Sequence, residues 1–158
     1  MKIVLRVGIA LLLVVSFVAA PCVAAEVSPE TKAEFKAFLD QYRKAFSAKD
    51  ADAVVAMYAP DAVLMGTGPD ELYEGADAIR KAHIQFFKSF EKEERTIEFL
   101  KVGTEGNVAW VVASMKFTSS MKDKKYEFII NSTTVLEKRD SKWLIVVRHI
   151  SNLASDKQ

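Results

Sequence analysis

The stretch Lys138-Arg-Asp-Ser-Lys-Trp-Leu-Ile-Val-Val-Arg-His-Ile-Ser151 decides the fold of this chain. It places a charged turn, residues 139–142, before an apolar strand that ends on polar side chains. Buried strands rarely carry polar groups, so Arg148, His149 and Ser151 indicate a sheet that opens onto a pocket or an interface. The turn predicts that this strand is the second arm of a hairpin.

Three further strands precede this one. They are expected at residues 96–102, 108–118 and 126–137, and the final strand at 143–151. The connections are short and rich in turn-forming residues, which is typical of hairpins. The second half of the chain therefore predicts a meander of four antiparallel strands.

The first half of the domain has helical patterning instead. Ser28 can cap a helix that has Pro29 at its first position. Asp50 can cap a second, short helix, which Pro60 is expected to stop. The first helix carries an apolar stripe at helical spacing, made of Phe35, Phe38, Leu39, Tyr42 and Phe46.

A short strand at residues 62–65 and a loop at 66–70 lead to a third helix that begins near Ala76. Its apolar face would hold Ile79, His83, Phe86, Phe87 and Phe90. Three helices followed by strands predict one α+β domain, in which a curved sheet wraps around helices packed on its inner face.

Residues 1–25 have the pattern of a secretory signal peptide. Lys2 and Arg6 give a positive start, residues 7–20 form an apolar run, and the small residues 23–25 form a cleavage site. We therefore expect a periplasmic or secreted protein.

The remaining domain is residues 26–158. Pro21 follows the apolar run too early for a membrane span, which needs about 18 or more apolar residues. Cleavage removes the one cysteine, Cys22, so no disulfide is expected. A lipoprotein acylated at Cys22 is the alternative, although Pro21 fits that processing poorly.

The charges of the domain are balanced. Without Lys2 and Arg6 the chain carries 20 basic and 21 acidic residues, which are interspersed along the sequence. No basic stripe marks a nucleic-acid surface, so we expect no nucleic-acid partner. The two histidines, His83 and His149, have no acidic neighbour at a metal-ligand spacing, so we expect neither a metal nor another cofactor.

Three stretches of the chain carry a family resemblance: Tyr42 with Lys49-Asp-Ala-Asp52, Met57-Tyr-Ala-Pro-Asp-Ala-Val63, and Tyr73-Glu-Gly-Ala-Asp-Ala-Ile79. With them, residues 38–152 resemble the SnoaL-like or ketosteroid-isomerase-like superfamily, which has the fold of nuclear transport factor 2. The closing hairpin also resembles the association domain of calcium/calmodulin-dependent kinases. The resemblance implies an α+β, cone-shaped half-barrel with a pocket at its wide end, and a homodimer that pairs through its sheets.

Isomerase chemistry in this superfamily needs a carboxylate base and two donors to an oxyanion. The resemblance places Tyr42 at the position of the oxyanion tyrosine. The base position falls on Gly66, which holds no proton acceptor, and the second donor falls near Thr133, where the isomerases have an acid. Only one of the three groups is present, so steroid-type isomerisation is not expected. The fold alone does not fix the chemistry.

The candidate ligand site is instead a polar surface on the last hairpin. With a two-residue turn at Asp140-Ser141, Thr133 would lie opposite Arg148 with Asn131 on the same face, a set that could bind a small anion. A bulge or a longer turn would change which residues face the cavity; the opposite set is Ser132, Thr134, Val147 and His149. The full set of predicted ligand-binding residues is Tyr42, Tyr58, Trp110, Asn131, Thr133 and Arg148.

Three functions remain open. The first is an exported protein that binds a small organic molecule in its cone, with anions among the candidate ligands. The second is an isomerase-like or cyclase-like enzyme in which Tyr42 and either His83 or His149 replace the missing carboxylate. The third is a dimeric assembly module whose pocket is vestigial.

Overall fold

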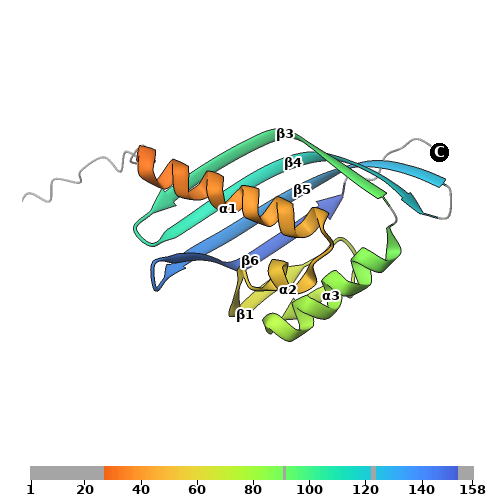
Figure 1. Ribbon diagram of the computed structural model, residues 1–158, viewed down its shortest axis with the longest axis horizontal. Coiled ribbons are helices and arrows are strands. Elements are labelled where there is room, and N and C mark those ends of the chain that lie inside the picture. Colours follow the sequence, from red (N-terminus) through yellow and green to blue (C-terminus); the bar gives the residue numbers. More distant parts are fainter. Residues whose placement is uncertain (1–26, 91, 122–123, 153–158) are drawn as a thin grey trace, which may run out of the picture.

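The computed structural model describes residues 27–90, 92–121 and 124–152, as three helices and one six-stranded sheet (Figure 1). Strand order is β2-β1-β6-β5-β4-β3, with β1 parallel to β6 and all other neighbours antiparallel. The predicted α+β fold, a curved and mostly antiparallel sheet wrapped around N-terminal helices, is confirmed. The predicted signal peptide lies outside the described residues. The elements are α1 (Pro29–Ser47), α2 (Ala51–Val55), β1 (Tyr58–Met65), β2 (Leu72–Glu74), α3 (Gly75–Ser89), β3 (Lys92–Glu105), β4 (Val108–Met121), β5 (Lys124–Arg139) and β6 (Lys142–Asn152).

The first two helices begin at the predicted capping residues. The Ser28 hydroxyl accepts a hydrogen bond from the Thr31 amide at 3.1 Å, and Pro29 is the first residue of α1. The Asp50 carboxylate accepts one from the Ala53 amide at 2.9 Å at the start of α2. These bonds satisfy amides that the first turn of a helix leaves without partners.

The region around Pro60 differs from the expectation. Helix α2 ends at Val55 and β1 begins at Tyr58, so Pro60 lies inside a strand and does not stop the helix. Proline has no amide to donate, and the pairing of β1 with β6 is interrupted between Tyr58 and Val63, where Pro60 lies. Strand β2 is absent from the sequence prediction, since three residues are too few to show alternation.

The four-stranded meander is confirmed, and its strands extend beyond the predicted ranges. The turn between β5 and β6 has two residues, because Arg139 pairs with Lys142. Asp140 and Ser141 have φ angles of 49° and 64°. A two-residue turn with positive φ at both central positions has a backbone twist that matches the twist of the paired strands.

A bulge in β6 changes the register beyond this turn. Leu136 pairs with Ile145, whereas Val135 pairs with Val147, so Val146 has no partner across the strand. One extra residue reverses the faces on which all later side chains of that strand lie, relative to its neighbour.

The expected pairing of Thr133 with Arg148 is therefore wrong. Thr133 pairs with His149, and Arg148 pairs with Thr134. Side chains alternate along a strand, so Asn131 and Thr133 share the face of His149, and Arg148 lies on the opposite face. The alternative raised by the sequence, a bulge, accounts for this change.

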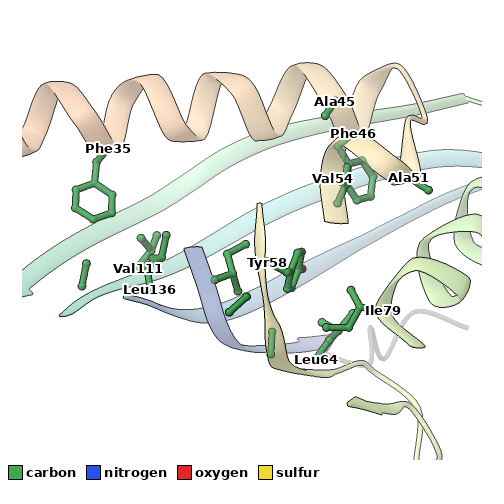
Figure 2. Packing of buried hydrophobic residues seen from close by; sticks show 14 of the residues in the cluster. Phe35, Ala45, Phe46, Ala51, Val54, Tyr58, Leu64, Ile79, Val111 and Leu136 are labelled. Atoms are coloured by element: carbon green, nitrogen blue, oxygen red, sulfur yellow. The ribbon is translucent and has the colours of Figure 1, made fainter. Parts of the chain in front are cut away.

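The hydrophobic core lies between the helices and the inner face of the sheet (Figure 2). Phe35 and Phe46 extend from α1 toward the strands, as the predicted apolar stripe requires. Leu136 and Ile145 meet them from β5 and β6 and are almost completely buried. Burial of such side chains removes apolar area from water and supplies most of the stability of the fold.

The outer face of the sheet carries none of the three described helices, all of which lie over the inner face (Figure 1). Several apolar side chains are exposed on this outer face. They are Met65, Leu72, Phe99, Trp110, Val112 and Val147. None of the helices in the described ranges is both long and apolar enough to cross a membrane.

His83 is buried in the core on α3, with 6% of its surface exposed. Its Nδ1 lies 2.8 Å from the Ile79 carbonyl oxygen, which can only accept, so Nδ1 carries the proton. Burial lowers the pKa of His83 to about 4; the hydrogen bond to Ile79 opposes this shift, and two nearby guanidiniums add to it. The ring packs among Phe46, Tyr58 and Phe87.

We predict that acidification from pH 7 to pH 5 removes about 2 kcal/mol of unfolding free energy through His83 alone. The unfolded chain binds a proton at His83 near pH 6.5, whereas the folded chain does so only near pH 4. Stability from this group is therefore fully present above pH 6.5 and is lost as the pH falls toward 4. Urea titrations of the wild type and of His83→Gln at both pH values measure it. Equal pH dependence in the two proteins would contradict the prediction.

Candidate functional site

A cavity of about 750 Å³ lies between α1 and the inner face of the sheet. Helix α1 forms one wall with the side chains of its apolar stripe, among them Phe35 and Tyr42. The opposite wall comes from β3, β4, β5 and β6. Its members are Arg95, Thr96, Ile97, Leu100, Val102, Val111, Ala113, Met115, Ser132, Thr134, Leu136, Ile145 and Arg148. A volume of this size suits a small organic ligand.

The cavity is held open because α1 is fastened at both ends. Near its start, the Glu34 carboxylate accepts hydrogen bonds from Lys138 Nζ at 2.8 Å and from Trp143 Nε1 at 2.8 Å. Just beyond its end, Lys49 Nζ donates to the Phe87 carbonyl oxygen of α3 at 3.2 Å. Between these attachments the helix passes over the cavity.

Arg148 is a buried charged group of the inner wall. Only 8% of its surface is exposed, and its Nη1 donates to the Tyr42 hydroxyl. The guanidinium also lies over the Tyr42 ring, 4.8 Å from its centre. No carboxylate of the described residues forms an ion pair with it, and its buried Nε has no hydrogen-bond partner in this part of the chain. A buried charge with donors to spare is the arrangement that an anionic ligand completes.

Arg148 keeps its charge at neutral pH. Burial disfavours the charged form, but the oxygens of Tyr42 and Tyr58 outweigh it and raise the pKa of Arg148. Burial raises the pKa of the Tyr58 hydroxyl, and the charge of Arg148 only partly offsets this. The cavity therefore has the positive charge of Arg148 beside the hydroxyl of Tyr42.

Two hydroxyls lie beside Arg148 on the inner wall. Thr134 is its partner across β5 and β6, and Ser132 is the next inward residue of β5. Both are buried. A second guanidinium, that of Arg95 on β3, stacks on the Phe46 ring at 3.6 Å from its centre.

The structure divides the predicted site residues between two faces. Tyr42 and Arg148 line the cavity, and Tyr58 is buried beside them. Asn131 and Thr133 lie on the outer face, where they border a separate hollow of about 120 Å³ with His149. They are therefore not brought together with Arg148.

Trp110 also lies on the outer face and not in the cavity. It packs across β3 on Gly103, where an added Cβ would lie 2.1 Å from the Trp110 ring. Only glycine fits beneath this ring, so Trp110 covers the backbone of the neighbouring strand.

Sequence reasoning missed three residues of the inner wall: Ser132, Thr134 and Arg95. An ideal hairpin register puts Ser132 and Thr134 on the opposite face, and the bulge at Val146 that changes this register has no signature in a uniformly apolar run. Arg95 follows a series of charged residues, a pattern that is typical of a solvent-exposed turn. Arg95 and Ile97 are two residues apart, and this strand spacing could have shown that both side chains lie on the inner face.

Groups capable of acid or base chemistry are scarce at the cavity. Asp40 is the one carboxylate among its described lining residues, and it is paired with Lys36 at 2.9 Å and Arg43 at 3.0 Å. Asp61 lies outside and bonds Arg139 at 2.7 Å. Within the described ranges, no three His, Cys, Asp or Glu residues gather as metal ligands would.

Comparisons with solved structures agree on this fold. A protein from Xanthomonas campestris, described as a calcium/calmodulin dependent protein kinase II association domain, is 27% identical with a TM-score of 0.69, over 82% of this chain and 91% of that one. A ketosteroid isomerase-like protein from Erwinia carotovora atroseptica is 23% identical with a TM-score of 0.69, over 81% and 100%. An NTF2-like protein of unknown function from Pseudomonas putida is 15% identical with a TM-score of 0.72, over 82% and 92%.

No curated protein matches the chain. Among protein families, the model of the SnoaL-like domain matches residues 35–155, which include α1 from Phe35 onward, α2, α3 and the whole sheet. The resemblance drawn from the sequence is confirmed by this match. The chain belongs to the family of SnoaL-like domains.

Proposed function

We propose that this SnoaL-like protein binds a small organic anion in the cavity between α1 and the sheet. The observation that carries the proposal is Arg148, a buried guanidinium with no carboxylate partner among the described residues and a free Nε donor. Withdrawing such a charge from water costs several kcal/mol unless a partner compensates. An anionic ligand would supply that partner.

The surroundings of Arg148 favour binding over isomerase-like catalysis. Asp40 is held in ion pairs at the rim, and His83 is buried with its Nδ1 bonded to a backbone carbonyl. His149 lies on the other face of the sheet. The enzyme hypothesis requires His83 or His149, together with Tyr42, to exchange a proton with a ligand in the cavity.

We predict that small carboxylates raise the melting temperature of the wild type and not that of Arg148→Met. A ligand at about 100 times its dissociation constant adds about 2.7 kcal/mol to the unfolding free energy, which corresponds to several degrees for a domain of this size. Met keeps an unbranched apolar stem in an apolar cavity, so the variant is expected to fold. A thermal-shift screen of carboxylates, phenolics and sterols measures the effect.

The matched control is Arg80→Met, which removes a guanidinium that pairs with Asp52 outside the cavity. It should respond to ligands as the wild type does. If a ligand still raised the melting temperature of Arg148→Met, the ligand would bind elsewhere, and this would refute the proposed binding site.

We also propose that two copies pair through the outer face of the sheet. This face has no helix over it and exposes Phe99, Trp110, Val112 and Val147. Exposed apolar patches of this kind are typical of protein interfaces, and twofold dimers are the commonest assembly.

Light scattering coupled to gel filtration tests the dimer. Val112→Lys would place two like charges near the centre of the interface, so we expect it to shift the equilibrium toward the monomer by at least about tenfold. Lys81→Glu on α3 is the control and should leave the mass unchanged. A monomeric wild type at micromolar concentration would refute this part of the proposal.

We further propose that the protein is exported, on the pattern of residues 1–25. Expression of the full chain in a Gram-negative host should place the protein in the periplasm. Its intact mass should then correspond to a chain that begins at Glu26. A cytosolic protein of full-length mass, or a lipid adduct on Cys22, would contradict this expectation.

A further inference from the structure

Along two rows of paired residues, the inner wall of the cavity changes from polar to apolar in one direction across the sheet; the second guanidinium, Arg95 of β3, lies in another row, with Phe117 and Phe128. Paired residues on β6, β5, β4 and β3 form a row made of Arg148, Thr134, Val111 and Val102. The next row contains Ile150, Ser132, Ala113 and Leu100. The polar groups thus lie on β5 and β6, and the β4 and β3 portions of the same rows are apolar.

The exposed fraction of the lining side chains increases in the same direction, from β6 toward β3. Arg148, Ser132 and Thr134 are all buried, whereas Leu100 is 42% exposed and Ile97 is 53% exposed, although both line the cavity. Strand β3 is the edge of the sheet. The cavity therefore opens along the slot between α1 and β3, and Arg148 lies at the far end.

The depth of the cavity follows from the strand order. Three strand intervals separate β6 from β3, and neighbouring strands lie about 4.8 Å apart, so the apolar path from Arg148 to the slot is about 14 Å. Apolar side chains of α1 cover this path, among them Phe38 and Leu39. The rim above the slot mixes charges of both signs, from Lys36, Asp40 and Arg43.

We propose that the ligand is an amphipathic monocarboxylate that enters with its carboxylate first. The carboxylate binds Arg148 beside the hydroxyls of Ser132 and Thr134, and an unbranched or aromatic apolar body about 14 Å long crosses β4 and β3 to the slot. This inference rests on the proposed binding of an organic anion and adds the length and orientation of the ligand. It also explains why Ile97 and Leu100 are exposed, since the far end of the ligand covers them.

Calorimetric titrations with butyrate, octanoate and dodecanoate test the proposal, each ligand below its micelle concentration. Affinity should rise about fourfold per added methylene group and level off once the chain reaches the slot. Dodecanol, which has the same body without the charge, should bind much more weakly than dodecanoate. Arg148→Met should lose affinity for all three carboxylates.

Leu100→Ser tests the orientation. It should reduce the gain from octanoate to dodecanoate and leave butyrate unaffected. Lys101→Gln is the matched control, because Lys101 is the adjacent residue of β3, on the outer face, and should change nothing.

The outcomes separate this inference from the proposed function. If butyrate and dodecanoate bind equally well and both require Arg148, anion binding stands and the long apolar path is refuted. If dodecanoate binds equally well to Arg148→Met, or dodecanol binds as tightly as dodecanoate, the position of the head group is refuted. If neither these chains nor any other organic anion binds, both proposals fail.

Discussion

One unpaired residue, Val146 in β6, determines which side chains of that strand line the cavity. Because it has no partner on β5, the strand gains one residue between Ile145 and Arg148, and both side chains face the helices. Without the bulge, the residues beyond it would turn to the other face, with Arg148 on the outer surface. Ile145 of the apolar core and Arg148 of the cavity therefore share one face of β6 only through this irregularity.

Much of the fold could be predicted because its signals are local. The Ser28 and Asp50 caps and the Asp140-Ser141 turn each depend on a few neighbouring residues. The bulge could not be located, because Ile145, Val146 and Val147 are all apolar and β-branched, and any of them fits either face. Which residue is left over depends on the pairing of β6 with both β1 and β5.

The candidate site shows the same division. Tyr42 could be assigned from the family resemblance together with its helical spacing in α1, and Arg148 from its place at the end of an apolar strand. The partners of Arg148 could not, because Ser132 and Thr134 face it only through a register set by the bulge. Asn131 and Thr133, two positions chosen from an ideal register, lie on the outer face for the same reason. The ligand-binding role of all these residues stays a prediction.

Helix α1 is attached to the rest of the domain by side-chain hydrogen bonds near its two ends. Glu34 holds the first end to the β5–β6 hairpin, and Lys49 holds the second to the end of α3. These attachments keep α1 in position above the cavity, so the side chains in the middle of the helix are not needed for that purpose. Substitutions at positions such as Phe38 or Leu39 can reshape the hollow while the architecture persists. Proteins with this fold can therefore differ in the shape of the cavity, and so in the ligands that they accept, through substitutions in one helix.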